Sequence, residues 1–330
     1  MNRGSDRMDG SIEITFHEAT FLSTTAVELH QVIKRFSGQS VVDELDLNVP
    51  TGSIYGFIGP NGSGKTTTMR LILRIYQPDS GHVEVLGSRD VKTADPRVGY
   101  LPEERGLYRR MTVRQILRYF AALKGVRRPG SLIDDYLERM EATSWQKKRI
   151  EQLSKGMAQK IQFIVALIAD PELVILDEPF SGLDPVNLDL IRNIVLELRN
   201  RGTTVIFSTH DMSQAQQMCD RVFMIYRGKK VLDGTIDSIR QSYGKCMIRA
   251  KIADGASIPA GLPGVLDQTA EQGFFDFRLN SESERQNLLN HLTQIGDVEH
   301  FETVRPTLHD IFVQIAKPKS SEIDTAEVIQ

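Results

Sequence analysis

The glycine-rich segment at residues 59–66 constrains this chain more than any other feature, because its sequence, GPNGSGKT, satisfies the pattern GxxxxGK[ST]. Residues 53–59 are typical of a strand and residues 66–76 of a helix, which is the context that this pattern requires. The glycines allow the backbone to curl so that successive N–H groups and the helix N-terminus face a polyphosphate. In that arrangement Lys65 neutralises the β- and γ-phosphates, and the Thr66 hydroxyl binds Mg²⁺. An accidental glycine-rich turn is the weaker interpretation, so the segment predicts a nucleoside triphosphate site. The residues predicted to bind the nucleotide here are Gly59, Pro60, Asn61, Gly62, Ser63, Gly64, Lys65, Thr66 and Thr67.

Two carboxylates at the end of an apolar run, residues 173–179 (LVILDEP), form the second chemical signal. The run is typical of a buried strand in a parallel sheet, and the carboxyl end of such a strand lies on the same edge as the phosphate loop. Asp177 is therefore placed to hold Mg²⁺, and Glu178 to orient and polarise an attacking water. An isolated Asp-Glu pair is more often a solvated strand end. Together with the phosphate loop, the pair predicts nucleotide hydrolysis.

The order of elements predicts the fold class. From Val27 onward, short β-rich runs alternate with helical patterns, which indicates an α/β domain with a mostly parallel core sheet. Residues 77–87 combine turn signals with alternation and indicate a strand of an antiparallel β side sheet. The pattern from about residue 105 to 170 is helical and indicates an inserted helical subdomain. Residues 203–210 (TTVIFSTH) predict another buried strand, and residues 221–234 a hairpin.

The composition changes after about residue 243, where strand-like runs, a glycine- and proline-rich stretch and two helices predict a small C-terminal α+β domain. The strand-like runs are residues 246–252, 274–279 and 298–304, and the helices are Glu284–Ile295 and the residues after Pro306. We therefore expect a loose extension at residues 1–26, a nucleotide-binding domain at 27–240, the α+β domain at 241–316 and a mobile tail at 317–330.

Charge and apolar content narrow the class of protein. The 40 Lys and Arg against 43 Asp and Glu leave a net charge of −3, so the whole chain has no electrostatic reason to bind nucleic acid. The most apolar run, residues 161–169, has about half of the roughly 20 residues that span a bilayer. The polar N-terminus lacks the apolar core of a signal peptide. Cys219 and Cys246 are far apart in sequence and fit a reducing compartment. The cytoplasm is the expected location.

Between the two phosphate-site segments stands Leu153-Ser154-Lys155-Gly156-Met157, and with it the chain resembles the ATP-binding cassette (ABC) ATPases, whose signature is LSGGQ. The resemblance covers about residues 27–240. It implies that Ser154 and Gly156 contact the γ-phosphate of ATP held by a second copy, so that a homodimer encloses two MgATP. A Ser and a Gly N–H at a helix N-terminus also form an anion site on physical grounds, although a lone LSxG is more often a plain helix cap.

Three further positions match this family. Residues 181–184 (SGLD), which end at Asp184, resemble the D-loop that couples facing sites across the dimer. His210 matches the switch histidine that senses the γ-phosphate and braces the catalytic water, whereas a lone histidine at a strand end is usually structural. Phe36 aligns with the aromatic residue that stacks on adenine. At such a position an aromatic residue is otherwise most often part of a core.

Two positions depart from the family pattern. Glu103 stands where the family usually has a Gln that touches Mg²⁺ and links the site to the helical subdomain. Its negative charge beside the phosphates must be offset by Mg²⁺, by Lys65 or by an arginine, and its linking role stays open. In the signature, Lys155 and Met157 replace Gly and Gln, and Lys155 brings positive charge close to the partner's triphosphate.

The runs GYLPEERGLY and LSKGM, together with a C-terminal domain that ends in PTLHDIF, resemble the ATPase subunits of ABC-2-type exporters, which include sodium- and drug-extruding systems. The resemblance implies a separate ATPase polypeptide, peripheral on the inner face of the cell membrane, that docks on a membrane permease. Residues 105–128 carry eight basic residues and no acidic one. We expect part of this stretch to lie against the permease or the anionic leaflet, although a solvated helix face explains it equally well.

Three questions stay open at this stage. A non-transport ABC ATPase that acts on ribosomes or DNA is the alternative function, but such proteins usually carry two cassettes or a long coiled coil, and no heptad run is present here. A module that uses ATP only to dimerise is a third interpretation. The C-terminal domain is either a ligand sensor or a dimer-stabilising surface.

Overall fold

The computed structural model describes residues 24–89, 95–104, 106–243, 247–253, 258–271, 273–304 and 306–316. Expectations for residues 1–23 and 317–330, and those that involve Arg105 or Cys246, lie outside this part of the chain. A six-stranded sheet runs through the main region, which we define as residues 24–243, in the order β5-β6-β7-β3-β8-β9. Neighbouring strands are parallel except for the antiparallel hairpin of β8 and β9, which confirms the predicted core sheet. The strands are β3 (Ile54–Ile58), β5 (Val98–Leu101), β6 (Leu173–Leu176), β7 (Thr204–Thr209), β8 (Arg221–Tyr226) and β9 (Lys229–Gly234).

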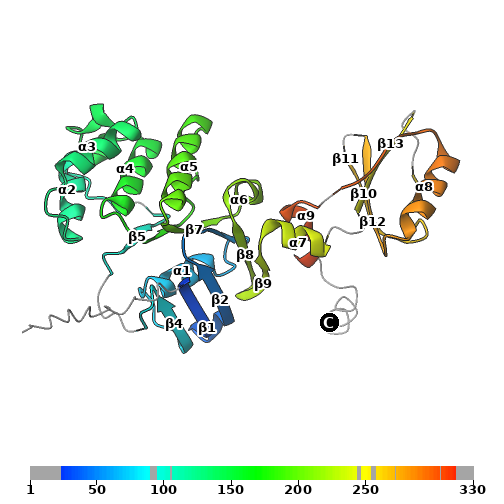
Figure 1. Cartoon of the computed structure of the whole chain (residues 1–330), viewed down its shortest axis with the longest axis horizontal. Helices are drawn as coiled ribbons and strands as arrows, with labels where there is room; N and C mark the ends of the chain where they lie inside the picture. Colours follow the sequence, from blue (N-terminus) through cyan, green and yellow to red (C-terminus); the bar gives the residue numbers. More distant parts are fainter. Residues whose placement is uncertain are drawn as a thin grey trace, which may run out of the picture.

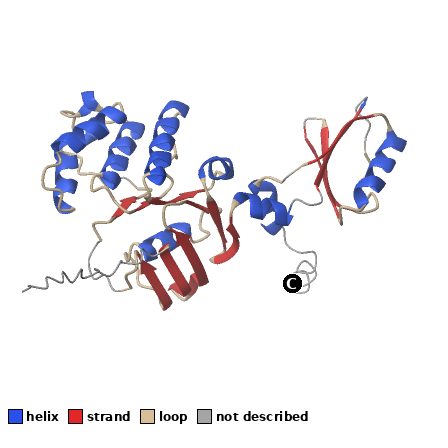
Figure 2. Ribbon diagram, in the orientation of Figure 1, coloured by secondary structure: helices blue, strands red, loops and turns tan. Residues whose placement is uncertain are grey.

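The central strands are apolar without alternation because both faces of the sheet are covered. Every residue of β3, β6 and β7 is buried, as expected for parallel strands between two layers. Helices α2, α3, α4 and α5 lie on one side of the sheet, and α1 with a second sheet lies on the other (Figures 1 and 2). The helices are α1 (Lys65–Ile72), α2 (Val113–Leu123), α3 (Gly130–Arg139), α4 (Lys155–Leu167), α5 (Pro185–Asn200) and α6 (Met212–Met218).

The second sheet is the antiparallel side sheet that the sequence predicted. Its order is β2-β1-β4, with strands β1 (Thr25–Phe36), β2 (Gln39–Pro50) and β4 (Ser80–Val85). Its inner face shares one apolar cluster with α1 and the core sheet. The helix expected over residues 66–76 is shorter, because Arg74 adopts a φ of 57° shortly before Pro78, and a proline cannot continue a helix.

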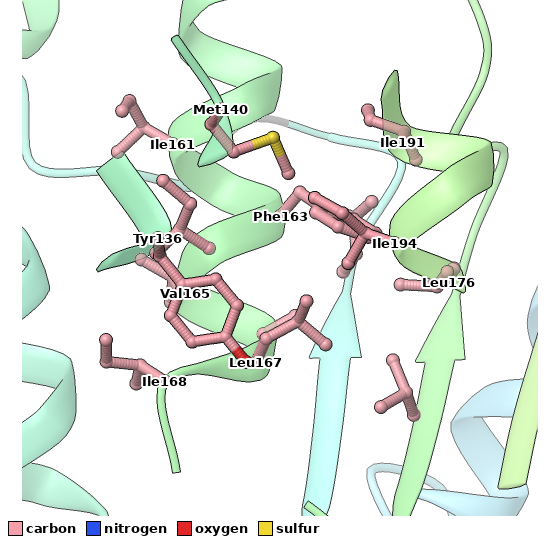
Figure 3. Close-up of a cluster of buried hydrophobic side chains, with 14 of the residues drawn as sticks. Tyr136, Met140, Ile161, Phe163, Val165, Leu167, Ile168, Leu176, Ile191 and Ile194 are labelled. Carbon is pink, nitrogen blue, oxygen red and sulfur yellow. The ribbon is translucent and has the colours of Figure 1, made fainter. Parts of the chain in front are cut away.

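The helical subdomain is present and is joined to the sheet by α4. Thr112 caps α2 and forms a capping box with Gln115, which fixes the start of this helix. Phe163 of α4 is fully buried and packs among Tyr136 and Met140 of the α3 side and Ile194 of α5 (Figure 3). Two 3₁₀ turns, Thr143–Trp145 and Ile150–Gln152, connect α3 to α4.

The C-terminal part contains a second antiparallel sheet, which we call the accessory sheet, in the order β11-β12-β10-β13. Helix α8 packs on one face of this sheet and shares its apolar cluster. The sequence predicted no strand at β11, because its sequence, VLDQTAE, has three polar residues in a row and lacks the alternation of a half-buried strand. Only the pairing with β12 makes it a strand. The elements are β10 (Met247–Ile252), β11 (Val265–Glu271), β12 (Phe274–Leu279), α8 (Glu284–Ile295) and β13 (Val298–Thr303).

The last helix, α9 (Leu308–Ala316), packs on the main region although the sequence analysis grouped it with the α+β domain. Its buried residues Leu308 and Ile311 share an apolar cluster with Ile58 and Met224 of the core sheet. Helix α7 (Ile236–Tyr243), which was not expected, packs beside it. Both lie between the core sheet and the accessory sheet (Figure 1). An amphipathic pattern predicts a helix but not the surface that covers it, so the placement of α9 required the structure. Within the described residues, no helix is both long and apolar enough to span a bilayer.

Candidate nucleotide site

The phosphate loop connects β3 to α1, and its backbone excludes side chains at two glycines. Gly59 has a φ of 150°, and a Cβ atom there would lie 2.3 Å from the carbonyl oxygen of Ile225. Gly64 has a φ of 111°, and its Cβ would lie 2.8 Å from the carbonyl oxygen of Val41. Both positions therefore require glycine, since no other residue fits the space or the conformation. The β8–β9 turn supports the loop from behind, where the N–H of Gly228 donates to the Ser63 carbonyl at 2.9 Å.

Lys65 lies inside the curled loop. Its Nζ donates hydrogen bonds to the carbonyl oxygens of Gly59 (2.7 Å) and Pro60 (3.0 Å). Burial lowers the pKa of Lys65 below its ordinary value of 10.5, and the carboxylates of Glu178, Asp177 and Glu103 oppose this shift. A buried ammonium group that faces carboxylates is poised to bind polyphosphate, whose negative charge strengthens the protonated form.

The loop opens into a cavity of about 310 Å³ that brings most of the predicted residues together. The phosphate loop, the carboxylates that follow β6 and the residue after Pro102 all contribute to it, so one space holds the predicted phosphate, metal and water ligands. Val41 of β2 also lines it and was not expected. The lining residues are Val41, Asn61, Gly62, Gly64, Lys65, Thr66, Thr67, Glu103, Asp177 and Glu178.

Asp177 offers the oxygen atoms that a magnesium ion takes. The carboxylate is 2% exposed. Its Oδ1 accepts hydrogen bonds from the hydroxyls of Ser208 (2.5 Å) and Thr66 (3.4 Å). Its Oδ2 is buried and has no hydrogen-bond partner among the described residues, which is costly unless a ligand satisfies it. The unpartnered Oδ2 of Asp177 and the hydroxyl of Thr66 together suit Mg²⁺, which keeps several waters and takes few protein ligands.

Glu178 is held in an unusual backbone conformation. Its φ is 49°, a region that non-glycine residues rarely occupy and that clusters at functional sites. Its N–H donates to the Ser208 Oγ at 2.9 Å, and its Oε1 lies 2.9 Å from the His210 Nδ1. Main chain and side chain of Glu178 are thus both fixed by residues at the end of β7.

Glu103 lines the cavity, and the main chain on either side of it is hydrogen-bonded to α4, the helix that begins within residues 153–157. Gln162 of α4 donates to the main-chain oxygens of Pro102 (3.4 Å) and Glu104 (3.1 Å), the residues on either side of Glu103. A second cavity of about 130 Å³ is lined by Glu103, Glu178 and Lys155, among others. The segment that carries Glu103 is therefore connected physically to the helical subdomain, which bears on the link that the sequence left open.

The predicted signature and D-loop residues lie outside the phosphate cavity of their own chain. Ser154 caps α4, where its Oγ accepts from the N–H of Met157 at 3.3 Å. Asp184 caps α5, and the backbone N–H of Asn187 holds the pKa of Asp184 below its ordinary range. The two segments pack on each other, since the Leu183 side chain lies 3.7 Å from the Cβ position of Gly156.

Phe36 also lies outside the lining of that cavity. It ends β1, is 41% exposed and meets the ring of Tyr76 edge-on at 5.3 Å. An exposed ring supported by a second ring remains available to stack on a base.

Ser208 is the site residue that sequence reasoning missed. It is fully buried and contacts both carboxylate residues. The available signal was a serine within the apolar strand sequence TVIFST, two residues before His210.

Comparison with known proteins agrees with this geometry. The protein family described as ABC transporter matches residues 42–181. A second family, described as ATP-binding protein DrrA1-3-like, C-terminal domain, matches residues 234–316. The ABC transporter ATP-binding protein YhaQ of Bacillus subtilis is 38% identical over 288 residues, which cover 87% of this chain and 97% of the relative. The chain belongs to the ABC transporter ATP-binding protein family. Cassettes of this family bind and hydrolyse ATP.

Two further comparisons bear on this ABC cassette. The Nod factor export ATP-binding protein I of Paraburkholderia xenovorans is 34% identical over 226 residues, 67% of this chain and 74% of that protein. A solved structure titled "Structure of ATP binding subunit of ABC transporter" superposes with a TM-score of 0.64 at 28% identity, covering 67% of this chain and 94% of the other. Fold class and family resemblance are therefore confirmed.

Proposed function

We propose that this chain is the ATP-hydrolysing subunit of an ABC-2-type exporter, that it closes as a homodimer around two MgATP, and that it drives a separate membrane permease. The observation that carries the proposal is the meeting, in one 310 Å³ cavity, of the phosphate loop with Asp177 and Glu178, and the contact of Glu178 with His210. Hydrolysis needs little covalent chemistry from the protein, so positioning and charge stabilisation by these groups account for catalysis.

Each residue has a proposed part in the hydrolysis of ATP. The phosphate loop and Lys65 bind the β- and γ-phosphates, and Phe36 stacks on the adenine. Thr66 and Asp177 hold Mg²⁺, which offsets phosphate charge when bound. Glu178 orients the attacking water for in-line displacement at the γ-phosphate, and His210 steadies Glu178 and the water.

A second copy completes the site in this proposal. Ser154, Gly156 and Asp184 stand outside the cavity of their own chain, although Ser154 and Gly156 begin a helix that is suited to an anion. In a head-to-tail dimer they face the nucleotide of the partner. A closed dimer that binds ATP better than ADP then opens after hydrolysis, and this difference in affinity supplies the work.

A mainly apolar groove is the proposed docking site for the permease. The groove has a volume of about 640 Å³ and lies between the end of α1, the edge strand β5 and helix α2. Its apolar lining includes Ile75 and Leu123, which are 55% and 64% exposed. Exposed apolar residues in a concave surface indicate a protein partner. A cytoplasmic helix of the permease is the occupant that we propose, since the family acts in transporters and a relative is named for export.

The basic stretch beside this groove is divided by the structure. Arg114 pairs with Asp134 at 2.5 Å, and Lys124 donates to the Val98 carbonyl at 2.6 Å, so both have structural partners. The described basic residues that remain exposed are Arg109, Arg110, Arg118, Arg127 and Arg128. We propose that these residues face the permease or the anionic leaflet and keep the ATPase at the inner face of the membrane. The relatives give no support to the alternative function on ribosomes or DNA.

The exchange Glu178→Gln tests the proposed hydrolysis. The variant removes the carboxylate and keeps its shape, so we expect unchanged ATP affinity, loss of steady-state turnover and an ATP-dependent dimer in size-exclusion chromatography with light scattering. Glu172→Gln, at the exposed residue before β6, is the matched control and should behave as wild type. Wild-type turnover in Glu178→Gln would contradict the assigned role. A wild-type protein that dimerises with ATP but never hydrolyses it would favour the binding-only module.

A further inference from the structure

Ser208 connects the two carboxylate residues of the site, although nothing in the family motifs points to it. It lies near the end of β7, has no exposed surface and follows an apolar run. The parallel pairing of Leu176 with Phe207 places the next residues, Asp177 and Ser208, side by side at the edge of the sheet.

We propose that Ser208 is a positioning residue for ATP hydrolysis, whose hydroxyl fixes which oxygen of Asp177 meets the metal and holds the backbone of Glu178. This inference rests on the proposed function. It extends that function to a residue which touches neither ATP nor water but acts through the two carboxylate residues.

The first part of the argument is the use of the Asp177 oxygens. Ser208 donates to Oδ1 at 2.5 Å, a short contact typical of a hydroxyl bonded to a carboxylate. Oδ2 stays buried without a partner among the described residues. Without this bond, only the longer contact from Thr66, at 3.4 Å, remains on Oδ1, so the carboxylate is able to turn and exchange its two oxygens. With the bond in place, Oδ2 alone is free to serve Mg²⁺ or a water bound to it.

The second part is the backbone of Glu178. The same Ser208 oxygen accepts the N–H of Glu178 at 2.9 Å, so one hydroxyl acts as donor and acceptor at once. This bond supports the φ of 49°, which is unfavourable for a residue with a side chain. Loss of the hydroxyl leaves a buried N–H unpaired and removes that support.

The third part is the relation between Ser208 and His210. His210 stands two residues after Ser208, just beyond the end of β7. Ser208 holds the main chain of Glu178 while His210 contacts its Oε1 at 2.9 Å. Residues at the end of β7 thus hold Glu178 at its main-chain N–H and at its Oε1. A shift at Ser208 therefore also moves the Glu178 carboxylate relative to the γ-phosphate.

Ser208→Ala tests the proposal with Mn²⁺ as the metal probe. In a Glu178→Gln background, where we expect no turnover, electron paramagnetic resonance measures the affinity of the ATP-bound protein for Mn²⁺. We expect this affinity to fall about 10–100-fold, as for other residues that orient a metal-binding carboxylate. ATP affinity in the absence of a divalent cation should stay unchanged. With Glu178 present, kcat should fall by about the same factor.

Ser53→Ala is the matched control. Ser53 is also nearly buried, but its Oγ donates to the Pro50 carbonyl at 2.7 Å, at the opposite end of the core sheet. This variant should lose stability without a change in Mn²⁺ affinity or kcat. Equal effects of Ser208→Ala and Ser53→Ala would overturn the proposal, as would wild-type Mn²⁺ affinity in Ser208→Ala.

A second pair of variants covers the case in which Ser208→Ala does not fold. Ser208→Thr keeps the hydroxyl, and Ser208→Cys offers a weaker donor. Both Mn²⁺ affinity and kcat should be higher for the threonine variant, and the reverse order contradicts the role. The failure of the proposed function is distinguishable, because turnover in Glu178→Gln would refute it whatever the Ser208 variants do.

Discussion

The exchange Ile311→Ala tests whether α9 is part of the structural unit that holds the nucleotide site. Ile311 has no exposed surface, and it packs in the cluster that contains Ile58, the residue directly before the phosphate loop. The helix follows the accessory sheet in sequence, so an independent C-terminal domain would include it. Its apolar contacts nevertheless lie with the main region, and their loss should weaken that region.

The size of the effect follows from the burial. Truncation of a fully buried isoleucine to alanine costs about 2–5 kcal/mol, because a cavity adds to the lost transfer free energy. At about 3 kcal/mol, and about 2–4 °C per kcal/mol for a domain of this size, the melting temperature should fall by about 6–12 °C. His309→Ala on the exposed side of α9 is the control and should change the free energy of unfolding by at most about 0.5 kcal/mol.

Trp145 provides the assay. It is the single tryptophan of the chain and packs against the cluster between the core sheet and the helical subdomain, whereas α9 belongs to another cluster. Its fluorescence therefore reports the unfolding of the main region and not that of the accessory sheet. Thermal transitions at Trp145 should shift in Ile311→Ala and not in His309→Ala. If Ile311→Ala and His309→Ala have the same transition temperature, α9 does not contribute to the unfolding of the main region, and our assignment of the helix is wrong.

Two further predictions concern charge. Burial lowers the pKa of Lys65 below 10.5. ATP affinity should therefore have its full value at pH values below that lowered pKa, and it should fall as the pH rises through it because Lys65 loses its positive charge. Calorimetry from neutral pH upward should show the fall in wild type and not in Lys65→Arg, and a fall that starts only above 10.5 would contradict the shift. Charge reversal at both Arg109 and Arg110 should weaken the free energy of binding to permease-containing membranes by at least about 2 kcal/mol, at about 1 kcal/mol per basic residue near the surface. Co-sedimentation with these membranes measures the loss, and basal ATPase activity should stay intact. Reduced hydrolysis with unchanged sedimentation would exclude the docking role.

Much of the site could be predicted from sequence because its chemistry is local. The phosphate loop needs glycines at set spacings between a strand and a helix, and Asp177 and Glu178 directly follow a buried strand. Since the carboxyl ends of parallel strands meet at one edge, the alternation of strands and helices was enough to expect these groups in one cavity. In the structure, the loop and both carboxylates line one cavity. Glu103 lines it too, but only the family resemblance pointed to that position.

Other features depend on contacts between segments that are distant in sequence. Ser208 reads as an ordinary strand residue until the pairing of β6 with β7 brings it beside Asp177. The α9 helix shows an amphipathic pattern that fits any apolar surface, and only packing decides that the cluster around Ile58 covers it. Local patterns in a sequence specify helices, strands and loops through backbone chemistry. Which side chains meet across them depends on strand order and burial, and these belong to the whole folded chain.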